Sequence, residues 1–172
     1  MDCRKLEITV VSANNLEDVR VFFGKTAVHA RVSINGKPET ERRTPTDTHG
    51  NQNPSWEFTT TYIIMETMLQ SCNAMLVVKL YCDRNAGDRY IGEVYISLME
   101  LFDCAKYNGD DEKSSNLQVE SDSCGRRSAV MTLPVMKGCI QSQGALKISY
   151  SFSDKVSFDQ LLMAENVAPL II

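Results

Sequence analysis

The strongest constraint on the fold is a period-two alternation of apolar and polar residues that recurs along most of the chain. Leu6, Ile8 and Val10 alternate with polar neighbours, and the run at 146–152 repeats the pattern. Because successive side chains of a strand point to opposite faces, this alternation predicts strands with one buried face. The same reasoning predicts strands at 28–34, 39–44, 56–61, 75–80, 90–96 and 129–135, and short helical turns at 65–72 and 98–102.

The connections between these strands are rich in turn-forming residues, as in the Asn35-Gly36 pair and the loop at 47–54. About eight short strands with little helix favour an all-β fold, an eight-stranded antiparallel β-sandwich. An α/β fold is disfavoured because it needs long amphipathic helices between its strands. We expect a single domain over residues 1–153.

Two segments depart from the strand pattern. Residues 103–128 are polar, and up to residue 124 they hold six acids against two bases, a local charge of −4. A long acidic loop of this kind is expected to be mobile. Residues 154–172 form a C-terminal tail, for which we expect a short helix with Val156, Phe158, Leu161 and Leu162 along one face. The tail either packs back on the sandwich or contacts a partner or a membrane.

Charge and composition exclude several classes of function. The net charge of −4 argues against nucleic-acid binding, because phosphate contacts require a basic excess. We expect a cytoplasmic protein, since no run of about 20 apolar residues exists and residues 1–5 lack an apolar signal core. The six cysteines form no C-x-x-C pair, and His29 and His49 are the two histidines. Neither a zinc site nor a catalytic motif is indicated, so we expect no enzyme and no cofactor.

Four motifs in register resemble the C2 domain family over roughly residues 5–152. They are Leu6-x-Ile8-x-Val10, Asn53-Pro54-x-Trp56, Ile91-Gly92-Glu93-Val94 and Gly144-x-Leu146-x-Ile148-x-Tyr150. The segments at 25–34, 43–47 and 80–94 look similar to small plant C2 proteins linked to cold and defence responses. The resemblance implies a Greek-key C2 sandwich over residues 1–153. It also implies a non-enzymatic module that brings proteins to membranes or to each other.

The resemblance also bears on calcium, a cation that requires several carboxylates among its oxygen ligands. Calcium-binding C2 domains supply these acids from their first and third loops. Three of those positions are not acidic in this chain: Ala27, Tyr81 and Arg89. We therefore predict calcium-independent action, with Asp18, Asp83 and Asp88 forming at most a weak residual calcium site. The alternatives are turn chemistry for Asp83 and Asp88, or a calcium-dependent phospholipid-binding module.

Two features point to a lipid- or partner-binding surface. Residues 20–43 hold six bases and two acids, a local charge of +4, and Phe22 and Phe23 lie in the first loop. The expected basic surface comprises Arg31, Lys37, Arg42 and Arg43. Arg42 and Arg43 are adjacent, so their side chains should point to opposite faces. The alternatives are a solvated strand that discourages edge pairing and phenylalanines that cap the core or dock a protein.

The expected partners follow from these surfaces and from the resemblance. They are an anionic membrane surface and a protein, and the resemblance suggests an immune regulator or a pathogen protein. We expect peripheral association with the plasma membrane, in plant stress or immune signalling, and no nucleic-acid partner.

Overall fold

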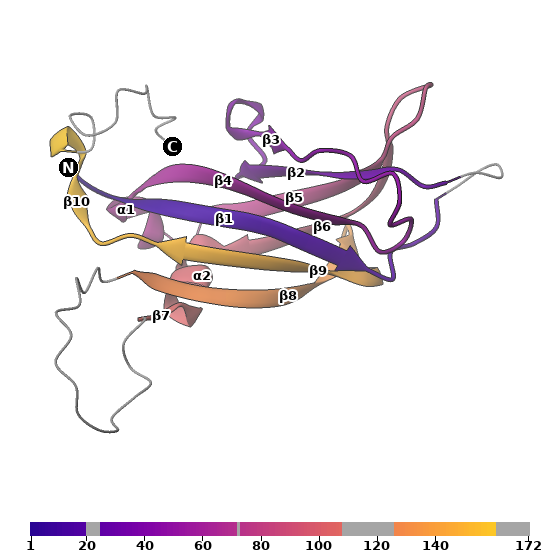
Figure 1. The fold of residues 1–172 in the computed structure, drawn as a ribbon. Coiled ribbons are helices and arrows are strands. Elements are labelled where there is room, and N and C mark those ends of the chain that lie inside the picture. The colour runs from indigo at the N-terminus through magenta and orange to yellow at the C-terminus, as the bar shows by residue number, and fades with distance from the viewer. Residues whose placement is uncertain (20–24, 72, 108–125, 161–172) are drawn as a thin grey trace, which may run out of the picture.

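The computed structural model describes residues 1–19, 25–71, 73–107 and 126–160 (Figure 1). Phe22 and Phe23, residues 108–125 of the predicted acidic loop and the tail beyond residue 160 lie outside the described residues. The strands are β1 (Asp2–Asn14), β2 (Val28–Ile34), β3 (Arg42–Arg43), β4 (Ser55–Met65), β5 (Met75–Cys82), β6 (Arg89–Ser97), β7 (Lys106–Tyr107), β8 (Arg127–Lys137), β9 (Ile140–Phe152) and β10 (Val156–Ser157). The helical elements are η1 (Pro38–Thr40), α1 (Glu66–Leu69) and α2 (Leu98–Cys104).

The strands form one curled antiparallel sheet whose two halves face each other. One half has the order β4-β1-β9-β8 and the other β6-β5-β2-β3. In the described chain, the pair Glu93–Met136 joins β6 to β8 and so connects the halves. Gly92 allows this approach, because a Cβ there would come within 2.5 Å of Val135 and 2.9 Å of the Met136 carbonyl oxygen. The all-β, eight-stranded antiparallel sandwich is confirmed, with β7 and β10 as two-residue additions.

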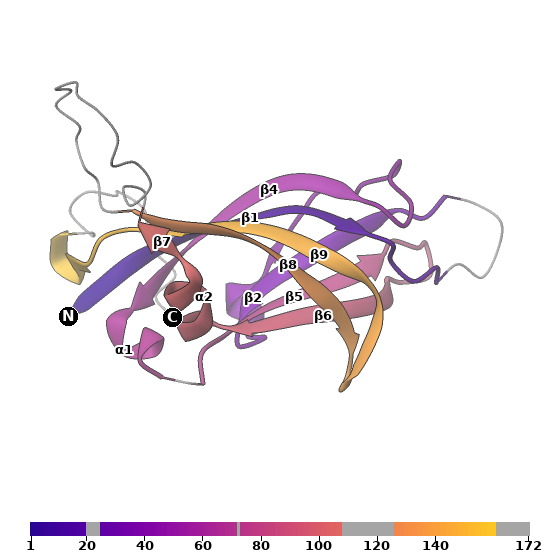
Figure 2. The same cartoon turned by 90° about the horizontal axis from the view of Figure 1, so that it is seen from below.

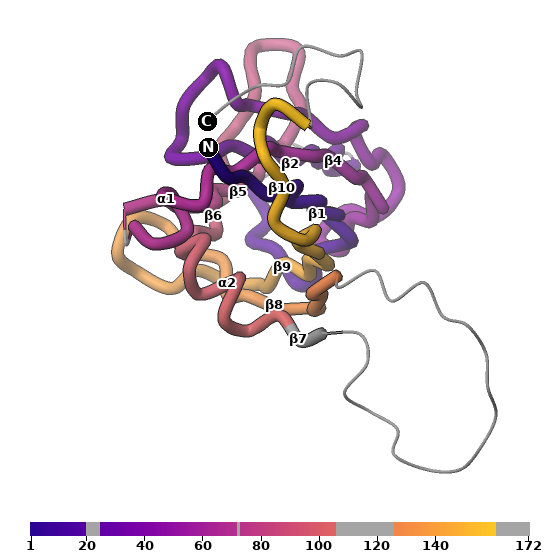
Figure 3. Tube along the Cα trace, turned by 90° about the vertical axis from the view of Figure 1, so that its left-hand side faces the viewer, coloured from indigo at the N-terminus to yellow at the C-terminus, as the bar shows by residue number. Residues whose placement is uncertain are grey.

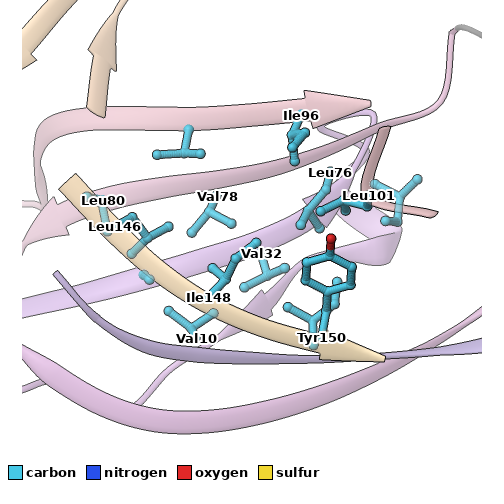
Figure 4. Close-up of a cluster of buried hydrophobic side chains, with 14 of the residues drawn as sticks. Val10, Val32, Leu76, Val78, Leu80, Ile96, Leu101, Leu146, Ile148 and Tyr150 are labelled. Atoms are coloured by element: carbon cyan, nitrogen blue, oxygen red, sulfur yellow. The ribbon is translucent and has the colours of Figure 1, made fainter. Parts of the chain in front are cut away.

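The core lies between the two halves, where the apolar residues of the alternating strands meet. Figure 4 shows Val10 and Ile148 from one half facing Val32, Val78 and Leu80 from the other, and all five are buried. Burial of such a side chain is worth about 1.5–3 kcal/mol relative to full exposure. The period-two pattern of the sequence therefore predicts correctly which face of these strands is inside.

The segment at 39–44, for which the sequence predicts a strand, is a strand at two of its residues only. Pro38–Thr40 forms η1, and the short strand Arg42–Arg43 pairs with β2. The buried hydroxyl of Thr40 donates to the Lys37 carbonyl oxygen at 2.8 Å and accepts from the Ile34 amide at 2.9 Å. These two bonds close a turn directly after β2 and leave little chain for a strand.

Other boundaries differ by a few residues from the sequence-based ranges. The predicted helical turns correspond to α1 and α2, and β8 and β9 are longer than the ranges expected from the sequence. The end of α2, all of β7 and the start of β8 fall inside the range 103–128, for which the sequence predicts a loop. The chain is therefore regular on both sides of residues 108–125.

Antiparallel pairing gathers four connections at one end of the sandwich. These are β1–β2, β3–β4, β5–β6 and β8–β9, and we call this the loop end, comprising residues 15–19, 25–27, 44–54, 83–88 and 138–139. The N-terminus, α1, α2 and β10 lie at the opposite end, which faces the viewer in Figure 3. None of the helices in the described ranges is long and apolar enough to cross a membrane.

Candidate functional site

The candidate site is a network of carboxylates and guanidinium groups where β2, β3 and β5 reach the loop end. Strand alternation turns His29 and Arg31 away from the core, because Val28, Ala30 and Val32 face inward. The register pairs His29 with Tyr81 of β5 and Arg31 with Arg43 of β3. Asp83 follows β5 directly, and its amide donates to the Ala27 carbonyl oxygen at 2.8 Å. The backbone thus places Asp83 beside His29.

Asp83 is held by three side chains. Arg43 Nη2 lies 3.0 Å and 3.1 Å from the two carboxylate oxygens, and the Thr46 hydroxyl donates to Oδ2 at 2.6 Å. His29 Nδ1 faces the Oδ1 atom. Partial burial pushes the pKa of Asp83 up, but the Thr46 hydroxyl, His29 and Arg43 outweigh it and leave that pKa below its ordinary value. Asp83 is therefore an ionised, fully engaged carboxylate at neutral pH.

Asp88 is held in a similar way by Arg31. Arg31 Nη2 donates to Asp88 Oδ2 at 2.5 Å, and Nη1 lies 3.6 Å from Glu41 Oε1. The guanidinium carbon of Arg31 also stacks 4.6 Å from the centroid of the Tyr81 ring. Contacts on both its edge and its face fix this guanidinium in one orientation.

His29 lies between the two acids and is fully buried. Its Nε2 accepts from Arg31 Nε at 3.2 Å, so the remaining ring proton sits on Nδ1 and is donated to Asp83. Its ring stacks on Tyr81 with the centroids 5.6 Å apart. Burial lowers the pKa of His29, and Arg43 adds to this effect against the opposing influence of Asp83 and Asp88. A neutral imidazole therefore bonds directly to Asp83 and is connected to Asp88 through Arg31.

By residue type, His29, Asp83 and Asp88 make a possible metal-ligand cluster, since their ligand atoms all lie within 4.8 Å of one another. The same carboxylates, however, already bind the guanidinium groups of Arg31 and Arg43. Asp18, in the loop after β1, is not part of this cluster. The structure thus brings together two of the three acids that the sequence analysis grouped.

The predicted basic surface is divided rather than continuous. Arg31 and Arg43 meet in the network, but Lys37 follows β2 at the opposite end of that strand. Arg42 pairs with Val32 and lies on the same face as that buried residue, whereas Arg43 lies on the opposite face. The adjacency of the two arginines predicts this arrangement. Phe22 and Phe23 lie outside the described residues.

Some charged residues at or beside the loop end were not among the predicted site residues. Lys25, Arg84 and Arg89 are exposed there, and Glu17 binds Lys137 at 2.7 Å. The sequence favours a structural role for His29 and does not indicate its contacts with Asp83 and Arg31. Arg43 and Thr46 lie three residues apart in the sequence, and both side chains contact Asp83. This close spacing is the sequence signal for the site.

The fold and the loop-end acids define the class of the protein. The C2 domain family model matches residues 4–115, and the chain belongs to this family. Among curated proteins, it is 32% identical to Protein SRC2 homolog of Arabidopsis thaliana and 33% identical to Protein SRC2 of Glycine max. These matches cover 92% and 91% of this chain but 43% and 48% of the relatives. The chain thus spans less than half the length of either relative.

Solved structures of low sequence identity share the fold. A C2 domain of a plant Extended Synaptotagmin 1 superposes with a TM-score of 0.63 at 16% identity, covering 89% of this chain and 96% of that domain. The calcium-bound pair of C2 domains from Extended-Synaptotagmin 2 gives a TM-score of 0.57 at 14% identity, covering 86% of this chain and 45% of that one. A C2 domain is a module of the type that interacts with lipids, membranes or proteins.

Proposed function

We propose that this C2 domain is a non-enzymatic module that associates peripherally with anionic membranes through its loop end, without calcium. The observation that carries the proposal is the pairing of Asp83 with Arg43 and of Asp88 with Arg31. These two carboxylates match acidic positions of the family, and each already has a cation of the protein itself.

Calcium fits these residues poorly. It takes about 6–8 oxygen ligands and is held by several carboxylates. Here the cluster offers two carboxylates and an imidazole nitrogen, and Arg31 and Arg43 place two positive charges against them. A calcium ion would have to displace both guanidinium groups and would still lack ligands. A calcium-dependent phospholipid-binding module is the alternative that the vesicle experiment below tests.

The exposed bases of the loop end support an anionic target. Lys25 and Arg84 lie at this end, Arg89 begins β6 next to it, and all three are exposed. Of the acids there, Glu17, Asp83 and Asp88 bind Lys137, Arg43 and Arg31. Asp47 accepts from backbone amides, and Asp18 is exposed. Each base near an anionic bilayer contributes about 1 kcal/mol of attraction, and salt screens it. A few such bases give a weak, reversible membrane association.

The setting of this activity is also part of the proposal. Both curated relatives are plant proteins, which supports a place in plant signalling, and the resemblance adds stress or immune responses. We propose a cytoplasmic protein that meets the plasma membrane peripherally and brings a protein partner with it.

Sedimentation with vesicles tests the proposal. Wild-type protein is mixed at low salt with neutral phosphatidylcholine vesicles or with vesicles containing phosphatidylserine, each with a chelator or with millimolar calcium. We expect binding to the anionic vesicles alone, equal in chelator and calcium, and weaker as salt increases.

Charge reversal locates the surface. Arg84→Glu should lower the partition coefficient roughly 30-fold, since replacing an attractive charge by a repulsive one changes the attraction by about 2 kcal/mol. Arg126→Glu is the matched control, because Arg126 is exposed near the start of β8, away from the loop end. Equal binding to both vesicle types, or binding that requires calcium, would refute the proposal. Capture of a protein with no vesicle binding would assign the loop end to protein recognition instead.

A further inference from the structure

One apolar side chain near the loop end is unusually exposed. Ile140, the first residue of β9, is 75% exposed, more than any other large hydrophobic residue of the described chain apart from Met1. It pairs with Lys137 across a two-residue turn formed by Gly138 and Cys139. Figure 2 shows this hairpin of β8 and β9 projecting below β6.

The base of the hairpin is fixed to the loop after β1. Lys137 Nζ binds Glu17 Oε2 at 2.7 Å, and Gln143 donates to Asn15 Oδ1 at 2.9 Å. At Gly144, which has a φ of +100°, a Cβ would lie 2.8 Å from the carbonyl oxygens of residues 14 and 15. This close packing holds the strand against the loop, so Ile140 is presented from a fixed support and little conformational entropy is lost when it binds.

Two bases lie in the same corner as Ile140. Residues 137–143 contain Lys137 and no acid. Arg89, at the start of β6, acts electrostatically on Glu17 and so lies in the same corner. Glu17 pairs with Lys137, and Asp18 follows Glu17 in the chain, so two acids balance the two bases along this corner. An exposed apolar residue beside bases suits the boundary between the acyl chains and anionic headgroups, where it needs no preformed pocket.

We propose that the β8–β9 hairpin is a membrane anchor, with Ile140 entering an anionic lipid surface beside Lys137 and Arg89. The inference rests on the membrane association proposed above and adds the residue that enters the bilayer and the corner that faces it. It requires the domain to sit tilted on the membrane, so that this hairpin and the loop at 83–88 both reach the headgroups.

Vesicle binding of Ile140→Asn tests the anchor without changing the charge. We expect a partition coefficient on phosphatidylserine vesicles roughly tenfold below wild type in chelator, from the loss of apolar transfer. Val130→Asn is the matched control, because Val130 is 62% exposed on β8 but lies away from the turn. It should bind as the wild type does.

A fluorescent probe reports the depth directly. An environment-sensitive nitrobenzoxadiazole label is attached to Cys139 in a variant with serine at Cys72, Cys104 and Cys124, and in a second variant to Cys104 with Cys139 replaced instead. Cys104 is exposed at the end of α2, at the opposite end of the domain. We expect blue-shifted, brighter emission on anionic vesicles at Cys139 and unchanged emission at Cys104.

The outcomes separate the two proposals. Wild-type binding that Ile140→Asn leaves unchanged, or a Cys139 label that stays in water on vesicle-bound protein, overturns the anchor while membrane association stands. The same water-like emission is expected if the hairpin serves a protein partner, so that result also counts against the anchor. Absence of wild-type binding to either vesicle overturns both proposals.

Discussion

Replacement of Arg43 by glutamine isolates the contribution of one guanidinium to the rejection of calcium. Arg43 Nη2 lies 3.0 Å from Asp83 Oδ1, and Gln cannot supply a positive charge there. We expect the wild-type chain to bind calcium no tighter than the millimolar range, and Arg43→Gln to bind it more tightly.

The size of the gain follows from Coulomb's law. A calcium ion on Asp83 would lie about 2.4 Å from its oxygen, and hence about 5 Å from the Arg43 nitrogen. A divalent and a monovalent cation at that separation in water repel by about 1.5 kcal/mol. The value for water applies because the Arg43 side chain is 49% exposed and solvent screens it. Removal of the charge should therefore raise calcium affinity roughly tenfold.

Titration calorimetry with calcium at low ionic strength measures this difference. Arg126→Gln is the control, since it removes the same charge from an exposed residue near the start of β8. Circular dichroism establishes that each variant is folded before calcium is added. If Arg43→Gln and Arg126→Gln change the affinity equally, or if the wild type already binds at micromolar calcium, the Arg43 guanidinium does not oppose calcium at Asp83.

Two further predictions concern stability. Tyr62→Phe should cost about 1–2 kcal/mol in urea unfolding, because the buried Tyr62 hydroxyl reaches the carbonyl oxygens of Val32 and Thr40 at 3.1 Å and 3.0 Å and so ties β4 to β2 and η1; an unchanged midpoint would contradict this. For His29, burial lowers the folded pKa below the ordinary 6.5, so the unfolded chain takes up protons first and the free energy of unfolding should fall as pH drops below about 6.5. His29→Gln should show a flatter profile between pH 7.5 and 5.5, and parallel profiles would count against a buried neutral imidazole.

Sequence patterns predicted the sandwich well because its strands obey a local rule. The inward residues of β1, β2 and β9 are those that the alternation selects, and the alternation is visible within each strand alone. The strand predicted at 39–44 is limited to Arg42–Arg43 for an equally local reason that composition does not reveal. Its threonine and arginine content suits a strand, but Thr40 uses its hydroxyl to close a turn on Lys37 and Ile34.

The site was less predictable because its contacts join residues far apart in the sequence. The sequence indicated Asp83 and Asp88 as candidate calcium ligands. Their partners on β3 and β2, however, lie 40 and 57 residues away in the chain. An excess of bases between residues 20 and 43 gave no sign that Arg31 and Arg43 would turn toward these acids. The register of β2 with β5 and β3 decides this, and that register depends on the complete fold.

The network also bears on how the proposed membrane association would be controlled. A bound calcium ion would both hold the loop carboxylates in place and add positive charge facing the headgroups. Arg31 and Arg43 already neutralise Asp83 and Asp88, and the stacking of Arg31 on Tyr81 fixes the orientation of its guanidinium. On the proposed function, the loop end needs no ion to become organised. Its attraction to an anionic surface would depend on ionic strength and on the lipid charge, which are the two variables that the vesicle experiments change.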